Sequence, residues 1–172
     1  MKENVVKVIV GVICFIVCFG IGSSIGANLF GNKIEEKTYS NSGFTITMED
    51  GFYEKDYIGA TFYYESQNAG ISVVKETYED LSSLEIDENV SLEEYAELVS
   101  YVNETDNEYQ KLNDQILYYT YDNTASGKNY SYMTAVTKGN TAFWIINLFC
   151  EEDNKDTYFP KFEKWLATIE VE

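Results

Sequence analysis

Carboxylates and phenols are the most numerous reactive side-chain groups in this sequence. Its 172 residues include 29 Asp and Glu and 15 Tyr, against 12 Lys, no Arg and no His. Histidine is the commonest general base and a common metal ligand, and arginine binds phosphate through two parallel hydrogen bonds. The composition therefore excludes sites built on imidazole or guanidinium groups, and it leaves carboxylates, phenols and thiols to consider.

A carboxylate pair can hydrolyse a glycosidic bond when two acids face each other across a cleft and one of them is desolvated. Nothing in the sequence marks such a pair. One acidic run fits part of a calcium-loop template, because Glu152, Asn154, Asp156 and Glu163 fall at its positions 1, 3, 5 and 12. Thr157 stands where that template has glycine. We therefore interpret the run as a solvated turn and helix cap, and we expect no metal and no cofactor.

The thiols offer little chemistry. Cys150 is the only cysteine outside the apolar stretch 8–30, and it ends an apolar strand-like segment. A nucleophilic thiol needs a base or a lowered pKa, and the chain has no histidine to provide the usual base. We therefore expect Cys150 to be a buried structural residue.

A group of tyrosines in strand-like segments is the second candidate site. If these tyrosines share a sheet face that the helices leave open, they form an aromatic platform for sugars, peptides or a partner protein. The other interpretation is core packing, because most of them alternate in phase with aliphatic residues. The group consists of Tyr63, Tyr118, Tyr119, Tyr121, Tyr130 and Tyr132.

The elements that position these residues follow an apolar N-terminal segment. Residues 8–30 contain no charge, and as a helix they extend roughly 34 Å, enough to cross a hydrocarbon core of about 30 Å. The segment is therefore predicted to be a transmembrane helix in contact with the lipid bilayer. Lys2 and Lys7 precede it, which places residues 1–7 in the cytoplasm and the rest of the chain outside. The alternative is a signal peptide cleaved near Gly26 or Ala27, followed by secretion.

Four small residues lie on one face of this predicted helix. Cys14, Cys18, Gly22 and Gly26 are spaced by four, and small side chains allow two helix backbones to approach closely. The pattern is consistent with a homodimer formed through the membrane helix. The alternative is that small residues are simply common in membrane helices.

After a short stalk at residues 31–38, residues 39–172 have the length of one domain. Residues 31–172 carry 28 acids and 10 lysines, a formal net charge of -18. Such a surface repels phosphate backbones, so we exclude nucleic acid as a partner.

The domain opens with an alternating strand at residues 44–48, which we expect to pair with a return strand after the Asp50-Gly51 turn. Segments 58–64 and 71–74 predict a second hairpin. Residues 115–151 predict a three-stranded meander that is apolar on both faces, and such strands are usually covered on both faces.

Two helices are expected. The first spans about Leu92 to Asn103, with Ser91 and Glu94 forming a capping box. The second lies in the region 159–169, with Pro160 in its first turn and Asp156 or Thr157 as its cap.

Together these features resemble the PsbP-like fold. They are the strand and turn of Phe44 to Phe52, Val73-Val74-Lys75-Glu76, the helix start Ser91-Leu92-Glu93-Glu94-Tyr95, the aromatic meander and the terminal helix. This fold includes the extrinsic proteins of photosystem II and many membrane-anchored or lipoprotein domains of bacteria with no established activity. The resemblance covers about residues 40–170, and it brings no catalytic residues with it. It implies an α+β domain with a central antiparallel sheet of about six to seven strands, flanked by helices and preceded here by the transmembrane helix.

The expected function is that of a non-enzymatic binding or assembly module of the bacterial cell envelope. It would be held at the membrane and would meet a protein or another envelope component outside the cell. The alternative is an envelope hydrolase that uses a carboxylate pair.

Overall fold

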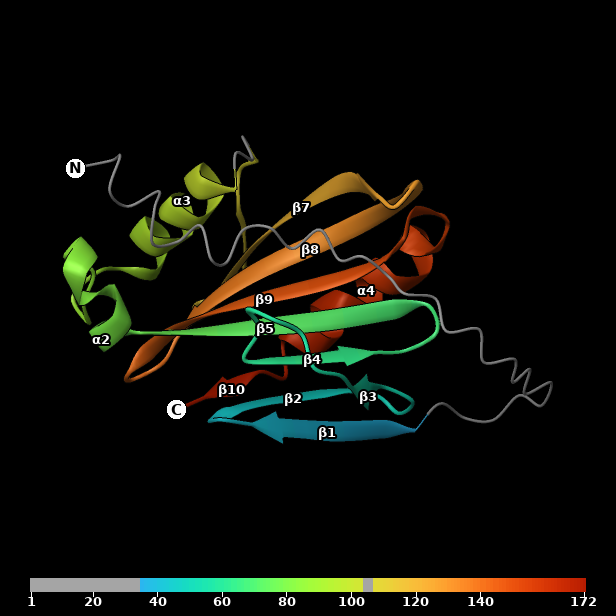
Figure 1. The fold of residues 1–172 in the computed structure, drawn as a ribbon, viewed down its shortest axis with the longest axis horizontal. Helices are drawn as coiled ribbons and strands as arrows, with labels where there is room; N and C mark the ends of the chain where they lie inside the picture. Colours follow the sequence, from blue (N-terminus) through green and yellow to red (C-terminus); the bar gives the residue numbers. More distant parts are fainter. Residues whose placement is uncertain (1–34, 104–106) are drawn as a thin grey trace.

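Two antiparallel sheets make up most of the computed structural model, which describes residues 35–103 and 107–172 (Figure 1). The larger sheet has the strand order β3-β4-β5-β9-β8-β7-β6, and the smaller has the order β1-β2-β10. The strands of the large sheet are β3 (Tyr53–Glu54), β4 (Phe62–Glu65), β5 (Ala69–Thr77), β6 (Gln110–Asn113), β7 (Ile116–Ala125), β8 (Lys128–Lys138) and β9 (Ala142–Glu151). Those of the small sheet are β1 (Glu36–Asn41), β2 (Phe44–Glu49) and β10 (Glu170–Val171).

The expected α+β class and the seven-stranded antiparallel sheet are confirmed. The hairpin β4–β5 and the meander β7–β8–β9 have the predicted antiparallel pairing. The predicted membrane helix 8–30 and its packing residues Cys14, Cys18, Gly22 and Gly26 lie outside the described residues. Within the described ranges, no helix combines the length and the apolar character that crossing a bilayer requires.

Helix α3 (Leu92–Val102) packs on one face of the large sheet. It begins with the predicted capping box, in which the Ser91 hydroxyl accepts from the Glu94 amide and the Glu94 carboxylate accepts from the Ser91 amide. Its buried residues join Val74, Leu117, Val136, Phe143 and Ile145 of the sheet. Helix α2 (Tyr78–Leu81) and the 3-10 helix η1 (Ser82–Leu84) precede it.

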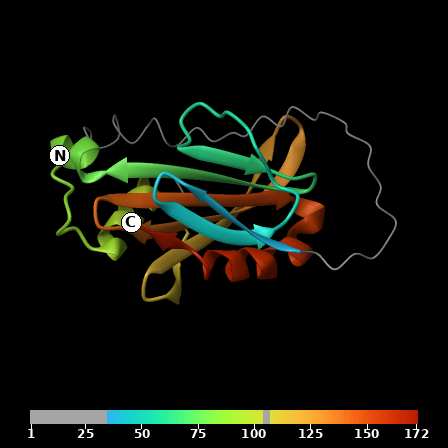
Figure 2. The ribbon, with the colours of Figure 1, turned by 90° about the horizontal axis from the view of Figure 1, so that it is seen from below.

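The opposite face of the large sheet carries the main core. The small sheet covers it with Phe44, Ile46 and Met48, and helix α4 (Lys155–Leu166) covers it with Phe162 and Trp165. Figure 2 shows α4 running beside the small sheet. The meander strands are therefore covered on both faces, as their apolar pattern predicted.

The predicted cap of the terminal helix was wrong. Helix α4 begins at Lys155, after the 3-10 helix η2 (Glu152–Asn154), so its N-cap is Asn154 and not Asp156 or Thr157. Pro160 consequently lies inside the helix and not in its first turn.

The predicted partner of the first strand was also wrong. β2 pairs with β1 through a tight turn at Ser42 and Gly43, which both have positive φ, and the return strand β3 belongs to the other sheet. β1 starts at Glu36, so strand structure begins within the segment 31–38 that we interpreted as a stalk. The second neighbour of β2 is β10, from the far end of the sequence.

Candidate interaction surface

The alternation of side chains along the meander divides the six candidate tyrosines between two faces. Tyr118 points to the core under α4, where its hydroxyl donates to the carboxylate of Glu163 over 3.0 Å and to the side-chain oxygen of Gln110 over 3.1 Å. The neighbouring residues Leu117 and Tyr119 point to the face that carries α3. Tyr118 is therefore separated from the other five, which lie on the α3 face: Tyr63, Tyr119, Tyr121, Tyr130 and Tyr132.

These rings form a continuous series across the sheet, which we call the tyrosine cluster. Tyr63 stacks on Phe149 with 6.2 Å between ring centroids, and Phe149 lies 5.9 Å from Tyr132. Tyr132 stacks on Tyr121 at 4.8 Å and an interplanar angle of 7°. The cluster therefore connects β4, β9, β8 and β7, and it is extended by Tyr57 at 5.3 Å from Tyr63, by Tyr119 at 5.9 Å from Tyr121 and by Tyr130 at 6.4 Å from Tyr132.

Gly70 on β5 leaves the space in which Phe149 of β9 contacts Tyr63 of β4. It pairs with Phe149, and a Cβ at position 70 would lie only 2.1 Å from Cζ of the Phe149 ring. The ring occupies the space that a side chain would take. Glycine is required here for its missing Cβ, because its φ is not positive.

Burial limits what the tyrosine cluster offers to a ligand. Tyr63, Tyr119, Tyr130 and Tyr132 are each less than 5 % exposed, and Tyr121 is partly buried. Burial raises the pKa of Tyr132 to about 12, so this phenol stays neutral near neutral pH. Packing inside the domain thus buries most of the ring surface. A tyrosine platform for a ligand remains a prediction.

A row of small polar groups crosses the same face in register with Tyr63 of β4 and Tyr119 of β7. Ser72 of β5 pairs with Asn147 of β9, and Asn147 pairs with Thr134 of β8, whose hydroxyl donates to the Asn147 side-chain oxygen. Ser72 and Thr134 are each 2 % exposed. Sequence reasoning missed this row because single polar residues inside apolar strands carry no motif.

Glu76 is the one buried carboxylate among residues 35–103 and 107–172. It is 8 % exposed, and its Oε2 accepts a hydrogen bond from the Tyr95 hydroxyl of α3. Tyr95 itself is fully buried and stacks on Phe143 at 3.9 Å. Burial raises the pKa of Glu76, the Tyr95 hydrogen bond opposes this rise, and the nearby Asp80 charge adds to it. No sequence signal distinguishes Glu76 from the exposed acids around it.

The segment from Glu76 to Gln110 has the largest excess of acids over lysines in the domain, and we call it the acidic segment. It contains twelve acids and no lysine. Tyr101 on α3 lies within it and is 57 % exposed. The acids that the structure shows as exposed are Glu79, Asp80, Glu85, Asp87, Glu88, Glu93, Glu94, Glu97 and Glu108.

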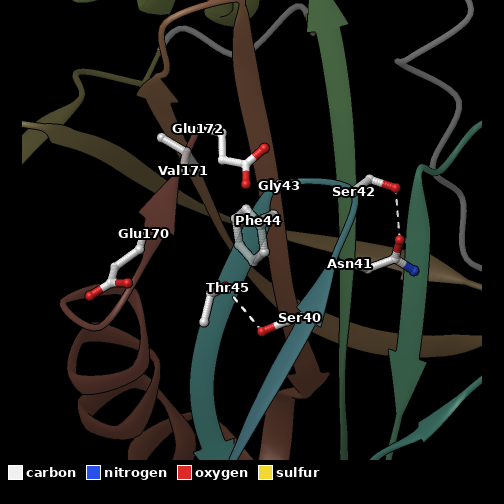
Figure 3. A pocket seen from close by; sticks show the side chains of 9 residues that line it. All are labelled: Ser40, Asn41, Ser42, Gly43, Phe44, Thr45, Glu170, Val171 and Glu172. Carbon is white, nitrogen blue, oxygen red and sulfur yellow. Dashed lines mark hydrogen bonds between the residues drawn. The ribbon is translucent and has the colours of Figure 1, made fainter.

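A hollow of about 410 Å³ lies at one end of the small sheet, beside the turn between β1 and β2 (Figure 3). Its polar groups largely satisfy one another, since the hydroxyls of Ser40 and Thr45 are 3.0 Å apart and Ser42 donates to Asn41. Glu170 and Glu172 are exposed, and Figure 3 shows their carboxylates pointing in different directions. This hollow therefore lacks the desolvated acid that the hydrolase hypothesis requires. The nine lining residues are Ser40, Asn41, Ser42, Gly43, Phe44, Thr45, Glu170, Val171 and Glu172.

The acidic run after β9 folds as helix and not as a calcium loop. Glu152 and Asn154 belong to η2, whereas Asp156 and Glu163 belong to α4. Within the ranges 35–103 and 107–172, no three Asp, Glu or Cys side chains are grouped so that they could hold a metal ion.

Cys150 is fully buried in the main core, as predicted, and burial raises the pKa of its thiol to about 12. We expect a maleimide to leave Cys150 unmodified in the native protein and to modify it fully in urea, because the thiolate is the reactive form. Mass spectrometry of a variant with Cys14→Ser and Cys18→Ser measures this directly. Rapid modification without urea would contradict the buried position.

No family model and no curated protein matches this sequence. Solved structures that are similar to it include the following two. The solution structure of cyanobacterial PsbP (CyanoP) from Synechocystis sp. PCC 6803 is 14 % identical, with a TM-score of 0.49 over 88 % of this chain and 99 % of that chain. A crystal structure from Bacteroides thetaiotaomicron VPI-5482 is 16 % identical, with a TM-score of 0.52 over 79 % of this chain and 48 % of that chain, so this chain spans about half of that length. Both likenesses concern the fold alone.

Proposed function

We propose that this protein is a membrane-anchored, extracytoplasmic binding or assembly module of the bacterial cell envelope, and that it acts without catalysis. Residues 8–30 anchor it in the bilayer. Its partner is a protein with a cationic surface, which docks on the acidic segment around the exposed face of α3.

The charge distribution of the acidic segment supports this proposal. Nine exposed acids gather on α2, α3 and the connections between β5 and β6, with no lysine in the same stretch. A predominantly acidic surface attracts an oppositely charged partner and raises its association rate. Tyr101, 57 % exposed among these acids, adds the kind of aromatic side chain that is enriched in interfaces.

Photo-crosslinking in cells tests the docking surface. A photoreactive phenylalanine analogue replaces either Tyr101 on α3 or Tyr53 on β3, which is 71 % exposed and outside the acidic segment. The Tyr101 position should give an adduct of one discrete mass, whereas the Tyr53 position should not.

Charge removal separates a specific contact from chance proximity. In the Tyr101 variant, Glu93→Gln with Glu97→Gln should reduce the adduct severalfold, because both acids are exposed on α3. Asp153→Asn with Asp156→Asn removes the same charge near the start of α4 and should leave the adduct unchanged. Equal adducts from both tyrosine positions, or no effect of the α3 substitutions, would reject this surface.

A further inference from the structure

We propose that the anchored domain stands upright on the bilayer, with the start of β1 and the lysines of α4 toward the lipid and the acidic segment at the far end. This inference rests on the membrane anchoring in the proposed function. It identifies which surface of the domain meets the lipid and which surface a partner can reach.

The length of chain between anchor and domain limits where the domain can be. The predicted anchor ends at Phe30, and β1 starts at Glu36, with Glu35 already bound through its carbonyl to the Asp50 amide at 2.8 Å. Five peptide steps between residues 30 and 35 span about 18 Å at most. The start of β1 must therefore lie close to the headgroups.

The surface around the start of β1 carries lysines of the domain. Lys164 of α4 forms an ion pair with Glu36 at 2.5 Å, and Lys161 forms one with Glu49 at 2.7 Å. Lys37 lies 3.7 Å from Asp50. Lysines thus neutralise several acids around the start of β1, whereas the acidic segment contains no lysine.

The acidic segment lies at the opposite end of the molecule. Figures 1 and 2 both show α2 at the other end of the long axis from the start of β1. The strand β8 runs between the two ends, with Lys138 bound to the carbonyls of Glu88 and Val90 at 2.7 and 2.8 Å. Its 11 residues extend about 36 Å, several times the roughly 8 Å over which physiological salt screens charge.

An anionic bilayer favours this upright orientation over one in which the domain lies flat. A flat domain would bring some of the nine exposed acids of the acidic segment within the screening length of lipid phosphates. The upright domain keeps them outside that distance. The surface proposed for the partner then points away from the membrane, where a second protein can approach it.

Headgroup quenching of fluorophores in the full-length protein tests the orientation. A fluorophore is placed at Lys164→Cys on α4 or at Glu79→Cys on α2, with Cys14 and Cys18 replaced by serine. The protein is reconstituted in phosphatidylcholine vesicles with a minority of phosphatidylglycerol and a headgroup-labelled quencher lipid. Quenching at position 164 should exceed that at position 79 severalfold, and a Gly/Ser insertion between residues 31 and 34 should reduce it.

The outcomes separate this inference from the anchoring on which it rests. Equal quenching at both positions, or stronger quenching at position 79, overturns the upright orientation. Protein that floats with the vesicles but shows quenching at neither position also overturns it, while the anchoring survives. Protein that fails to float with the vesicles rejects the anchoring and the orientation together.

Discussion

Replacing Gly70 with alanine is expected to destabilise the domain by about 1–3 kcal/mol, as overpacking of a tight core does. The new Cβ would lie 2.1 Å from Cζ and 2.6 Å from Cε2 of Phe149, whose ring is fully buried between Tyr63 and Tyr132. The Phe149 ring is fully buried and Gly70 pairs with both β4 and β9, so neither the ring nor the strand can shift freely. Chemical denaturation of the full-length protein in detergent measures the loss.

A double variant tests whether the clash with Phe149 is the cause. Phe149→Ala alone should also destabilise the domain, since it empties a buried ring site. In that background Gly70→Ala should have a much smaller effect, because the obstructing ring is gone, so the two changes should be strongly non-additive. Additive losses would show that Gly70 is needed for another reason.

Removing the Tyr95 hydroxyl is the second substitution with a large expected effect. Tyr95→Phe keeps the ring stacked on Phe143 but leaves the Glu76 carboxylate buried without its hydrogen bond. A buried polar group without a partner costs about 1–3 kcal/mol, so we expect a loss of that size at pH 8. The loss should be smaller at pH 5, where a larger share of Glu76 is protonated. Thermal unfolding of the detergent-solubilised protein at both pH values measures it.

Glu76→Gln should have the opposite effect. Burial raises the pKa of Glu76 above 4.5, so the native state holds this proton more tightly than the unfolded chain does. The stability that comes from this proton is present in full below the unfolded pKa, and it is lost as the pH rises through the native pKa. Glutamine keeps an acceptor for Tyr95 and cannot ionise. Its stability advantage over the wild type should therefore grow from pH 5 to pH 8, and a constant difference would contradict the assignment.

The parts of the fold that follow from local pattern were predictable. The capping box at Ser91 and Glu94 predicted where α3 begins. The apolar residues on both faces of the meander predicted that other elements cover both faces of its strands. Pairing between distant segments was not predictable. The Asp50-Gly51 turn indicated a hairpin, whereas Ser42-Gly43 forms the actual turn, because tertiary contacts decide which neighbouring strands pair. α2 and β10 were missed because each is too short to show a period.

The sequence predicted which residues form the candidate site better than it predicted how they are arranged. The alternation of side chains along β7 places Tyr119 and Tyr121 on one face of the sheet and Tyr118 on the other. That Tyr63 belongs to the same cluster of rings, across Gly70, follows only from the register of the strands. The desolvation of Glu76 depends on the position of α3, which local sequence does not encode. The acidic segment, by contrast, is visible directly in the sequence as a run without lysine.

The strand β2 lies between partners from the two ends of the domain, and this affects how the chain can fold during synthesis. The hairpin β1–β2 forms from neighbouring residues, but Thr47 bonds Thr168, 121 positions later. Contacts of such separation form late and slow folding. While the ribosome completes the chain, the apolar side of the hairpin, with Phe44, Ile46 and Met48, has neither the large sheet nor α4 to cover it. The nascent domain is thus exposed to aggregation until α4 has been made, so its biogenesis should depend on chaperones that shield this hairpin.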